Sequence, residues 1–258
     1  MMRFYSEYNE RTLDNFKAVF EQHKVVHVTA DLQDIDPESF FKDLAAQVGL
    51  PLIYEEDPAT GQINVNEWTE IKYEPENASN TYKSSNKFQP LHTDYGYFSF
   101  EIYAAFFYCV TQAKFGGATT FIDVDTIVDI LKGVDPRLFN EIQKHKITFG
   151  RKGNPIAFNE DFILQKDALG WKLNWNYYRA MDDKVNQGLI EEFKGFIDHY
   201  IEKSGELKAI KLSPGEGVFF QDRRVLHGRN SFIGDRHLNK GGIAIEVPKE
   251  IQQILQNL

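Results

Sequence analysis

The sequence has a single cysteine, Cys109, among 258 residues. One cysteine cannot form a disulfide within the chain, so the fold cannot depend on internal disulfides, and we expect a reducing compartment such as the cytoplasm. Cys109 lies in the apolar run 103–110, which indicates a small core residue rather than a nucleophile.

Long hydrophobic runs are also missing. The longest are about eight residues, far below the roughly 20 that a membrane-spanning helix needs. The first residues, Met1 to Glu7, turn polar at once, so no secretory leader is expected. The sequence therefore predicts a protein of the cytoplasm that does not span a membrane.

The chain has fewer basic than acidic residues: 29 Lys and Arg against 38 Asp and Glu, which gives a net charge of −9. Binding of nucleic acid without sequence specificity requires a basic surface, so we expect no nucleic-acid partner. We expect a small-molecule substrate instead. Hydrophobic residues make up 42% of the chain, enough for a packed core. The oligomeric state stays open.

Strand-like segments dominate the centre and the C-terminal part of the chain. Asp36 and Pro37 suit the cap and the first turn of a helix. Helices are predicted over 10–23, 36–49, 124–133, 135–145 and 184–204, and strands over 24–28, 97–110, 118–123, 207–212, 217–221, 224–227 and 242–247. The pattern predicts a single, mainly β domain, a sandwich or barrel with flanking helices.

His92-Thr93-Asp94 is the segment most indicative of chemistry. In an extended chain residues two apart project to the same face, so His92 and Asp94 can converge on one ion while Thr93 points away. His227, within Val-Leu-His-Gly-Arg, is the best candidate for a third ligand. Two imidazoles and one carboxylate can hold a divalent iron on one face and leave positions open for a cosubstrate and oxygen.

Four ordered motifs carry a family resemblance: LHTDYGYF (91–98), FGGATTFID (115–123), LSPGEGVFFQDRRVLHGR (212–229) and GDRHL (234–238). Together they resemble the Fe(II)/2-oxoglutarate-dependent dioxygenases of the taurine dioxygenase, γ-butyrobetaine hydroxylase and clavaminate synthase-like family. The resemblance implies a double-stranded β-helix (jelly-roll) core over about 88–245, preceded by a helix and strand region over 1–87.

The resemblance also implies which residues bind iron and perform catalysis, namely His92, Asp94 and His227. It implies Fe(II), 2-oxoglutarate as cosubstrate and O2, with hydroxylation of an unactivated C–H bond and with succinate and CO2 as coproducts. Related halogenases have a small residue where Asp94 stands, so that chloride can coordinate. A carboxylate there favours hydroxylation over halogenation, whereas desaturation and cyclisation stay open.

By the same resemblance, Thr119 and Arg236 bind the carboxylate of 2-oxoglutarate. A planar guanidinium can bind a carboxylate through two parallel charge-assisted hydrogen bonds, which a lysine cannot reproduce. Arg236 follows His227 more closely than the family spacing leads one to expect. Arg229 is therefore an alternative candidate for this role, although its position beside the metal ligand His227 makes it difficult for its side chain to reach the carboxylate.

Aromatic and amide side chains between the ligand motifs indicate a substrate pocket. Tyr95 and Arg179 are the candidates for substrate contact, since Arg179 could pair with an anion and aromatic rings could line a pocket for an ammonium group. The same residues could instead pack the core, with Arg179 in an internal ion pair. A small polar metabolite such as an amino acid or betaine is the expected substrate. The further members of this group are Tyr97, Trp171, Asn174, Trp175, Asn176, Tyr177 and Tyr178.

Two other functions stay open. A cupin-like isomerase or hydrolase would use His and carboxylate ligands with zinc or manganese and without 2-oxoglutarate, so it would not need Thr119 and Arg236 as a clamp. A non-catalytic jelly-roll binding protein would have no reason to keep all three ligands. The complete ligand set and the clamp together favour the oxygenase.

Overall fold

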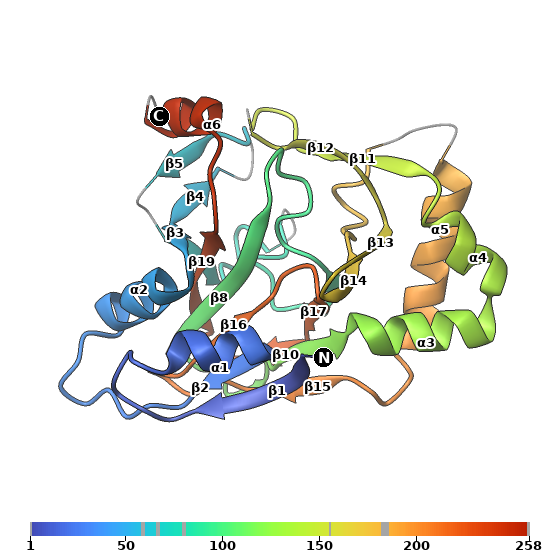
Figure 1. The fold of residues 1–258 in the computed structure, drawn as a ribbon. Coiled ribbons are helices and arrows are strands. Elements are labelled where there is room, and N and C mark those ends of the chain that lie inside the picture. Colours follow the sequence, from blue (N-terminus) through green and yellow to red (C-terminus); the bar gives the residue numbers. More distant parts are fainter. Residues whose placement is uncertain are drawn as a thin grey trace.

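The computed structural model describes residues 2–57, 60–65, 68–78, 81–154, 156–181 and 186–256. Over these residues the protein is mainly β with six α-helices (Figure 1). Seven strands form one sheet and four form a second. The prediction of a mainly β fold with flanking helices is therefore confirmed.

The larger sheet runs through the middle of the molecule. Its β1 and β2 pair in parallel, and its other strand pairs are antiparallel. Strand β6, Thr69–Lys72, pairs with β19 beside the main path. Along that path the strands are β1 (Arg3–Tyr8), β2 (His23–Val28), β16 (Gly217–Phe220), β8 (Ile102–Thr111), β19 (His237–Ala244) and β3 (Leu50–Leu52).

The smaller sheet packs against the larger one. The ring of Phe220 on β16 lies 5.3 Å from the ring of Phe107 on β8 and 5.2 Å from the ring of Phe121 in the smaller sheet. All three side chains are buried, so the main core lies between the two sheets. In order, the strands of the smaller sheet are β15 (Lys208–Ile210), β10 (Thr119–Asp123), β17 (Val225–Arg229) and β7 (Gln89–His92).

Four short antiparallel pairs lie outside the two sheets. They join β4 (Tyr54–Glu56) to β5 (Ile63–Val65), β9 (Phe115–Gly116) to β18 (Phe232–Ile233), β11 (Lys146–Gly150) to β12 (Phe158–Phe162), and β13 (Leu164–Asp167) to β14 (Gly170–Leu173). Strands of two to five residues show too little alternation to be predicted from sequence.

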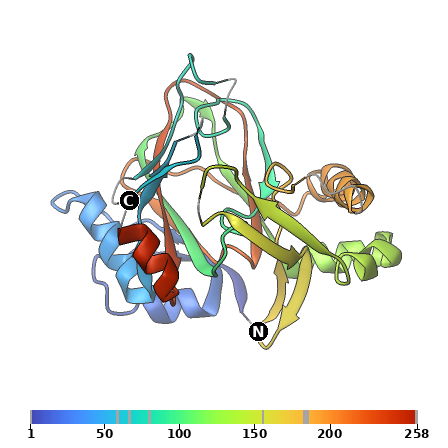
Figure 2. The same cartoon turned by 90° about the horizontal axis from the view of Figure 1, so that it is seen from above.

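The helices form groups on opposite sides of the sheets (Figures 1 and 2). On one side α1 and α2 cover the outer face of the larger sheet, and alternation along β8 directs Phe106 toward them and Phe107 into the main core. On the other side lie α3, α4, α5 and the π-helix η1 that continues α5. The helices are α1 (Phe16–Gln22), α2 (Pro37–Val48), α3 (Val124–Val134), α4 (Pro136–Glu141), α5 (Gln187–Phe196), η1 (Ile197–Ile201) and α6 (Lys249–Gln256).

Helix starts were predicted best where a cap is present. The Asp36 side chain accepts a hydrogen bond from the Ser39 N–H at 3.0 Å, and Pro37 is the first helical residue, as predicted. The helix predicted over 10–23 begins later, at Phe16, and its Asn15 cap makes no side-chain hydrogen bond. Of the helix predicted over 184–204, positions 184 and 185 lie outside the described residues.

The strand predicted over 97–110 is wrong at its start. Strand β8 begins at Ile102, and residues 94–100 form turns and bends between β7 and β8. One of these turns is closed by the Phe98 N–H, which donates to the Tyr95 carbonyl at 3.0 Å. The aromatic side chains of this segment enter the core all the same, and a short apolar run does not distinguish a buried strand from a buried turn.

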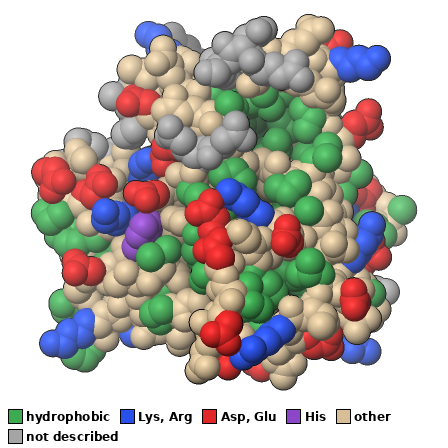
Figure 3. Space-filling model, turned by 90° about the vertical axis from the view of Figure 1, so that its left-hand side faces the viewer, with side chains coloured by type: hydrophobic (Ala, Val, Ile, Leu, Met, Phe, Trp, Pro, Cys, Tyr) green, Lys and Arg blue, Asp and Glu red, His purple; other side chains and the backbone are tan. Residues whose placement is uncertain are grey.

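The surface mixes charges of both signs on the side that lies to the left in Figure 1. Figure 3 shows acidic and basic side chains interspersed across this side, with hydrophobic side chains around a hollow in its upper part. Across the described part of the chain, no helix is long and apolar enough to cross a membrane.

Phe219 tests the packing between the larger sheet and its helices. Its ring is fully buried, 4.9 Å from the Phe106 ring and 4.7 Å from the Phe16 ring. We expect Phe219→Ala to lower the free energy of unfolding by about 3–5 kcal/mol, because a cavity remains, as measured by urea denaturation. The control Ile233→Ala removes a side chain that is 65% exposed and should change it by less than about 0.5 kcal/mol. Equal losses would contradict this account.

Candidate metal centre

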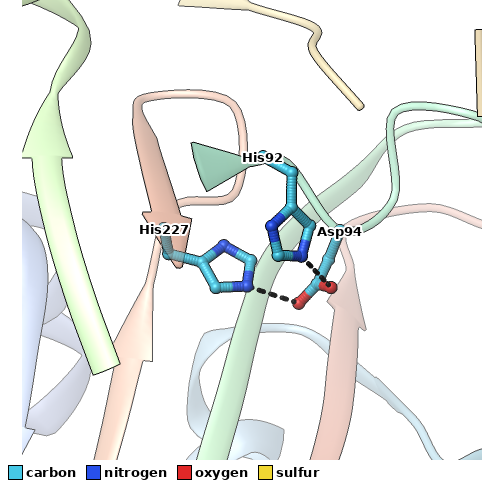
Figure 4. A group of neighbouring side chains, drawn as sticks. All are labelled: His92, Asp94 and His227. Carbon is cyan, nitrogen blue, oxygen red and sulfur yellow. Dashed lines mark ion pairs between the residues drawn. The ribbon is translucent and has the colours of Figure 1, made fainter. Parts of the chain in front are cut away.

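The side chains of His92, Asp94 and His227 point toward one another (Figure 4). One potential ligand atom from each lies within 4.8 Å of the others. His227 Nε2 lies 3.4 Å from Asp94 Oδ2, and His92 Nε2 lies 3.7 Å from Asp94 Oδ1. Nitrogen and oxygen ligands bind metal ions at about 2.0–2.2 Å, so two ligands of one ion are roughly 3–3.5 Å apart. The cluster is therefore close to the size of a metal site.

Strand pairing brings the two histidines together. His92 ends β7 and lies opposite His227 of β17, with 4.3 Å between the ring centroids. The close approach of the strands depends on Gly228, because a Cβ there would lie 2.7 Å from the Gln89 carbonyl oxygen. Residues 135 positions apart in the chain thus become neighbours through the smaller sheet.

Asp94 joins the cluster from a turn, not from a strand. The expectation that His92 and Asp94 project from one extended segment is wrong, because β7 ends at His92. The buried Asp222 carboxylate accepts hydrogen bonds from the backbone N–H groups of Asp94 at 2.7 Å and Tyr95 at 2.9 Å. Because these groups bond to a side chain, they cannot continue a strand ladder. The same bonds fix the backbone that carries the Asp94 side chain.

A second set of hydrogen bonds holds this turn from the other side. The Thr93 N–H donates to the Trp175 carbonyl at 2.6 Å, and the Asn174 amide donates to the Gly96 carbonyl at 2.8 Å. The Asn176 amide donates to the Thr93 carbonyl at 3.3 Å. The Asn-Trp-Asn segment, considered above for substrate contact, thus braces the backbone of the His-x-Asp motif.

The hydrogen bonds of His92 leave one ring nitrogen available. His92 Nδ1 lies 2.8 Å from the Pro90 carbonyl, which only accepts, so Nδ1 carries the proton. Gln89 Nε2 lies 3.2 Å from His92 Nε2 and can donate to its lone pair, a hydrogen bond that a metal ion bound at Nε2 would replace. A ring held in this way by its outer nitrogen is typical of metal-binding histidines.

Burial and neighbouring charges set the protonation of the other two groups. Burial lowers the pKa of His227 to about 3, against the opposing effect of Asp94, so this imidazole is neutral at pH 7. Burial by itself would raise the pKa of Asp94, but the positive charge of Lys240 holds that pKa well below its usual range. Lys240 Nζ lies 2.7 Å from Asp94 Oδ1. The carboxylate is therefore ionised and ready to bind a cation.

The cluster lies on the wall of a pocket of about 1130 Å³, to which His92 and Asp94 contribute. Arg179 also lines this pocket; its guanidinium is 3.5 Å from a Glu56 oxygen and 4.9 Å from the centre of the Tyr97 ring. Tyr95 is buried, with Lys240 Nζ 4.6 Å from its ring centre, and is not among the described residues that line the pocket. Substrate contact by Tyr95 and Arg179 stays a prediction.

Arg236 and Thr119 are brought together in the structure. Arg236 Nε donates to the Gly117 carbonyl at 3.0 Å, and Nη2 lies 3.4 Å from Thr119 Oγ1. Burial lowers the pKa of Arg236 to about 9. A cavity of about 10 Å³ lies beside it, enough for about one water molecule.

Arg229 is the other buried guanidinium near the site. Its Nη2 donates to the carbonyls of Ser85 at 2.7 Å and Lys87 at 2.9 Å, and burial lowers its pKa to about 10. Among the described residues, no carboxylate forms an ion pair with Arg229 or Arg236. A buried charge without a counter-charge is costly, so an anionic ligand would be stabilised here.

The family of the chain follows from a comparison with known protein families. A family model described as "Taurine catabolism dioxygenase TauD, TfdA family" matches residues 4–241. The chain belongs to the TauD/TfdA family. The matched span contains the smaller sheet, most of the larger sheet and the three clustered side chains, and it confirms the resemblance drawn from the four motifs.

Two curated relatives of this TauD/TfdA chain are enzymes named for their substrates. Human gamma-butyrobetaine dioxygenase is 24% identical over 164 residues, which are 58% of this chain and 41% of the relative. Bovine mitochondrial trimethyllysine dioxygenase is 25% identical over 166 residues, which are 57% of this chain and 38% of the relative. The match thus spans about two fifths of the length of these relatives.

Solved structures share the fold of the TauD/TfdA chain. A taurine dioxygenase from Burkholderia xenovorans superposes with a TM-score of 0.65 and 16% identity, over 95% of this chain and 88% of that one. The non-heme iron oxygenase OrfP, in complex with Fe and alpha-ketoglutaric acid, gives a TM-score of 0.67 and 11% identity, over 93% and 80%. At such identities the likeness establishes the fold alone.

Asp222 gives a test of how the cluster is held. We expect Asp222→Asn to weaken binding of Co(II), a spectroscopic substitute for Fe(II), by about 10–100-fold, because an amide cannot accept from both N–H groups of Asp94 and Tyr95. The change would be read from the visible absorption of bound Co(II). The control Asp167→Asn removes a carboxylate that pairs with Arg224 and should leave Co(II) affinity unchanged. A loss of thermal stability with unaltered Co(II) affinity would contradict the assignment.

Proposed function

We propose that the chain is an Fe(II)- and 2-oxoglutarate-dependent oxygenase that hydroxylates an unactivated C–H bond of a small molecule. The observation that carries the proposal is the cluster of His92, Asp94 and His227 on the wall of a large pocket. Two imidazoles and one carboxylate are the donor set of non-heme iron oxygenases. Membership of the TauD/TfdA family supports the same activity.

The fold supports a jelly-roll core. We assign residues 88–245 to a double-stranded β-helix core, and the region 1–87 adds β1, β2, β3 and β6 to the larger sheet as part of one domain over 1–258. In this arrangement His92 and Asp94 lie at and just beyond the end of one strand, and His227 lies on a late strand. The single cysteine supports a cytoplasmic location.

Each residue of the cluster has a distinct part in holding the metal. His92 Nε2, His227 Nε2 and an Asp94 oxygen would bind Fe(II), while the Pro90 carbonyl fixes the His92 ring and Asp222 fixes the turn of Asp94. When bound, Fe(II) and 2-oxoglutarate supply the oxidising chemistry: 2-oxoglutarate loses CO2 and becomes succinate, one oxygen atom of O2 enters succinate and the other enters the C–H bond. The protein contributes orientation and a partly closed pocket.

Arg236 and Thr119 would hold the carboxylate of 2-oxoglutarate that lies away from the metal. The donor set fits, because a buried guanidinium without an acidic partner faces a hydroxyl group. The cavity beside Arg236 has the volume of about one water, so Leu212 and Leu238, which line it, must shift when the carboxylate enters. This pair also separates the oxygenase from a cupin-like isomerase or hydrolase, which needs no such clamp.

The substrate we propose is a small polar metabolite such as an amino acid or a betaine. Charged and aromatic side chains line the pocket, among them Tyr97, Tyr177 and Arg179. Asp94 supplies a carboxylate where a halogenase would admit chloride, so hydroxylation is the favoured outcome. The names of the curated relatives, a gamma-butyrobetaine and a trimethyllysine dioxygenase, are compatible with this class.

Removal of a ligand tests the iron site. We expect His92→Ala and His227→Ala to abolish retention of iron and consumption of 2-oxoglutarate, because two ligands do not hold a divalent iron firmly. Iron would be measured by elemental analysis after desalting, and succinate by mass spectrometry. The control His199→Ala changes an exposed histidine on η1 and should keep both. Normal turnover in either ligand variant would exclude the assigned site.

Replacement of the two buried arginines tests the clamp. Arg236→Gln should weaken the use of 2-oxoglutarate by about 2–4 kcal/mol in kcat/KM, since one partner of a buried charge pair is lost. Arg229→Gln should have a smaller effect, because Arg229 already donates to two backbone carbonyls. Steady-state kinetics with varied 2-oxoglutarate measure both. The reverse order of the two effects would assign the clamp to Arg229.

The activity itself is tested with a pool of substrates. The purified protein is incubated with Fe(II), 2-oxoglutarate, ascorbate and a pool of amino acids, betaines and small acids, with His92→Ala as control. Mass spectrometry should detect succinate and a species that has gained one oxygen atom. Absence of succinate from a protein that holds iron would favour a metalloenzyme that does not use 2-oxoglutarate.

A further inference from the structure

Most acidic side chains that line the pocket are matched by a cation. Glu55 pairs with Lys83 at 2.5 Å, Asp94 pairs with Lys240 at 2.7 Å, Asp198 pairs with Lys194, and Glu56 pairs with Arg179 at 3.5 Å. These pairs neutralise the wall locally, so apart from Asp94, which is assigned to the metal, none of these carboxylates needs a charged ligand.

Glu202 is the exception among the described acidic residues of the pocket wall. Its Oε1 is buried and makes no hydrogen bond, and its carboxylate forms no ion pair within the described chain. Burial, and next the charge of Asp198, raise the pKa of Glu202 above its usual range. A buried acceptor without a donor costs free energy comparable to a lost hydrogen bond. The fold therefore keeps an unfavourable group in the pocket wall.

Glu202 owes this position to the π-helix. Its backbone N–H donates to the Ile197 carbonyl at 3.0 Å, a bond five residues long that widens the last turn before the chain leaves the helix. π-helical turns are rare and are found frequently at functional sites. Helix α5 carries this turn, and its Phe193 packs 4.7 Å from the ring of Trp175, another residue of the pocket wall.

The site is also close to the candidate metal ligands. The Leu91 N–H interacts with the Glu202 carboxylate, and Leu91 directly precedes His92. A group bound at Glu202 therefore lies beside the end of the strand that carries the first ligand. A small molecule bound there by one end can therefore lie in the same pocket as His92 and Asp94.

We propose that Glu202 binds a cationic N–H group of the substrate, a primary ammonium or a guanidinium. The inference rests on the proposed function and specifies its substrate class. An N–H cation supplies the charge and the donor that Oε1 lacks, and charge-assisted hydrogen bonds are the stronger kind. A quaternary ammonium supplies charge but no donor, so it would leave Oε1 unbonded.

The test compares three cations, two with N–H groups and one without. The protein, loaded with Fe(II) and 2-oxoglutarate without oxygen, is titrated with n-butylammonium, n-butylguanidinium and butyltrimethylammonium, and binding is followed by calorimetry. We expect at least one N–H cation to bind more tightly than the trimethylated probe, and Glu202→Gln to weaken it by about 10–100-fold. The control Glu206→Gln changes an exposed glutamate that does not line the pocket and should keep the affinity.

Thermal stability separates a binding role from a structural one. Without the probe, Glu202→Gln should melt at the same temperature as the parent protein or higher, because the variant removes a half-buried negative charge that has no ion-pair partner among the described residues. A lower melting temperature with unchanged probe affinity would overturn the proposal, as would tighter binding of butyltrimethylammonium or failure of both N–H cations to bind. Binding of 2-oxoglutarate in the same samples shows independently whether the proposed oxygenase site is intact.

Discussion

The buried Asp222 carboxylate holds together the two halves of the candidate site. It accepts the backbone N–H groups of Asp94 and Tyr95 while it stands in the turn between β16 and β17, five residues before His227. A carboxylate with two such bonds fixes a turn that no strand ladder supports. Because β17 also pairs with β7, the two histidines and the aspartate are placed by one hydrogen-bonded unit.

Several charged side chains in and around the candidate site are placed where they could bind a ligand of opposite charge. Asp94 is kept ionised by Lys240, whereas Arg236 and Arg229 are buried without acidic partners among the described residues. Glu202 presents the opposite sign in the pocket wall. Since electrostatic interactions are strong where water is excluded, each such group costs stability until a ligand of the opposite charge arrives. A metal ion, a dicarboxylate and a cationic substrate would each bind beside a side chain of opposite charge.

Much of this could be predicted from the sequence, and the failures have a physical cause. Hydrophobic spacing and caps predicted most helices, as for α2 with its Asp36 cap. The strand predicted over 242–247 is wrong in its bounds, because β19 runs from His237 to Ala244. The strand proposed from residue 97 failed because buried aromatic residues occur in turns as well as in strands, and the Asp222 bonds that favour the turn come from 128 residues away. Asp222 and Lys240 carry no local pattern that would have indicated their contacts with the motif.

The sequence by itself determined the chemistry of the candidate site: the His-x-Asp pair, the distal histidine, the threonine and arginine that we propose as a clamp, and the family to which the chain belongs. Residue types and their order suffice for that, because they specify which ligands and donors are available. Only the tertiary structure decided which of them meet, which side chain fixes Asp94, and that Glu202 remains without a partner. Those facts depend on contacts between segments that are distant in the chain. In a buried site such contacts determine the hydrogen bonds and the electrostatic interactions, and no local sequence pattern specifies them.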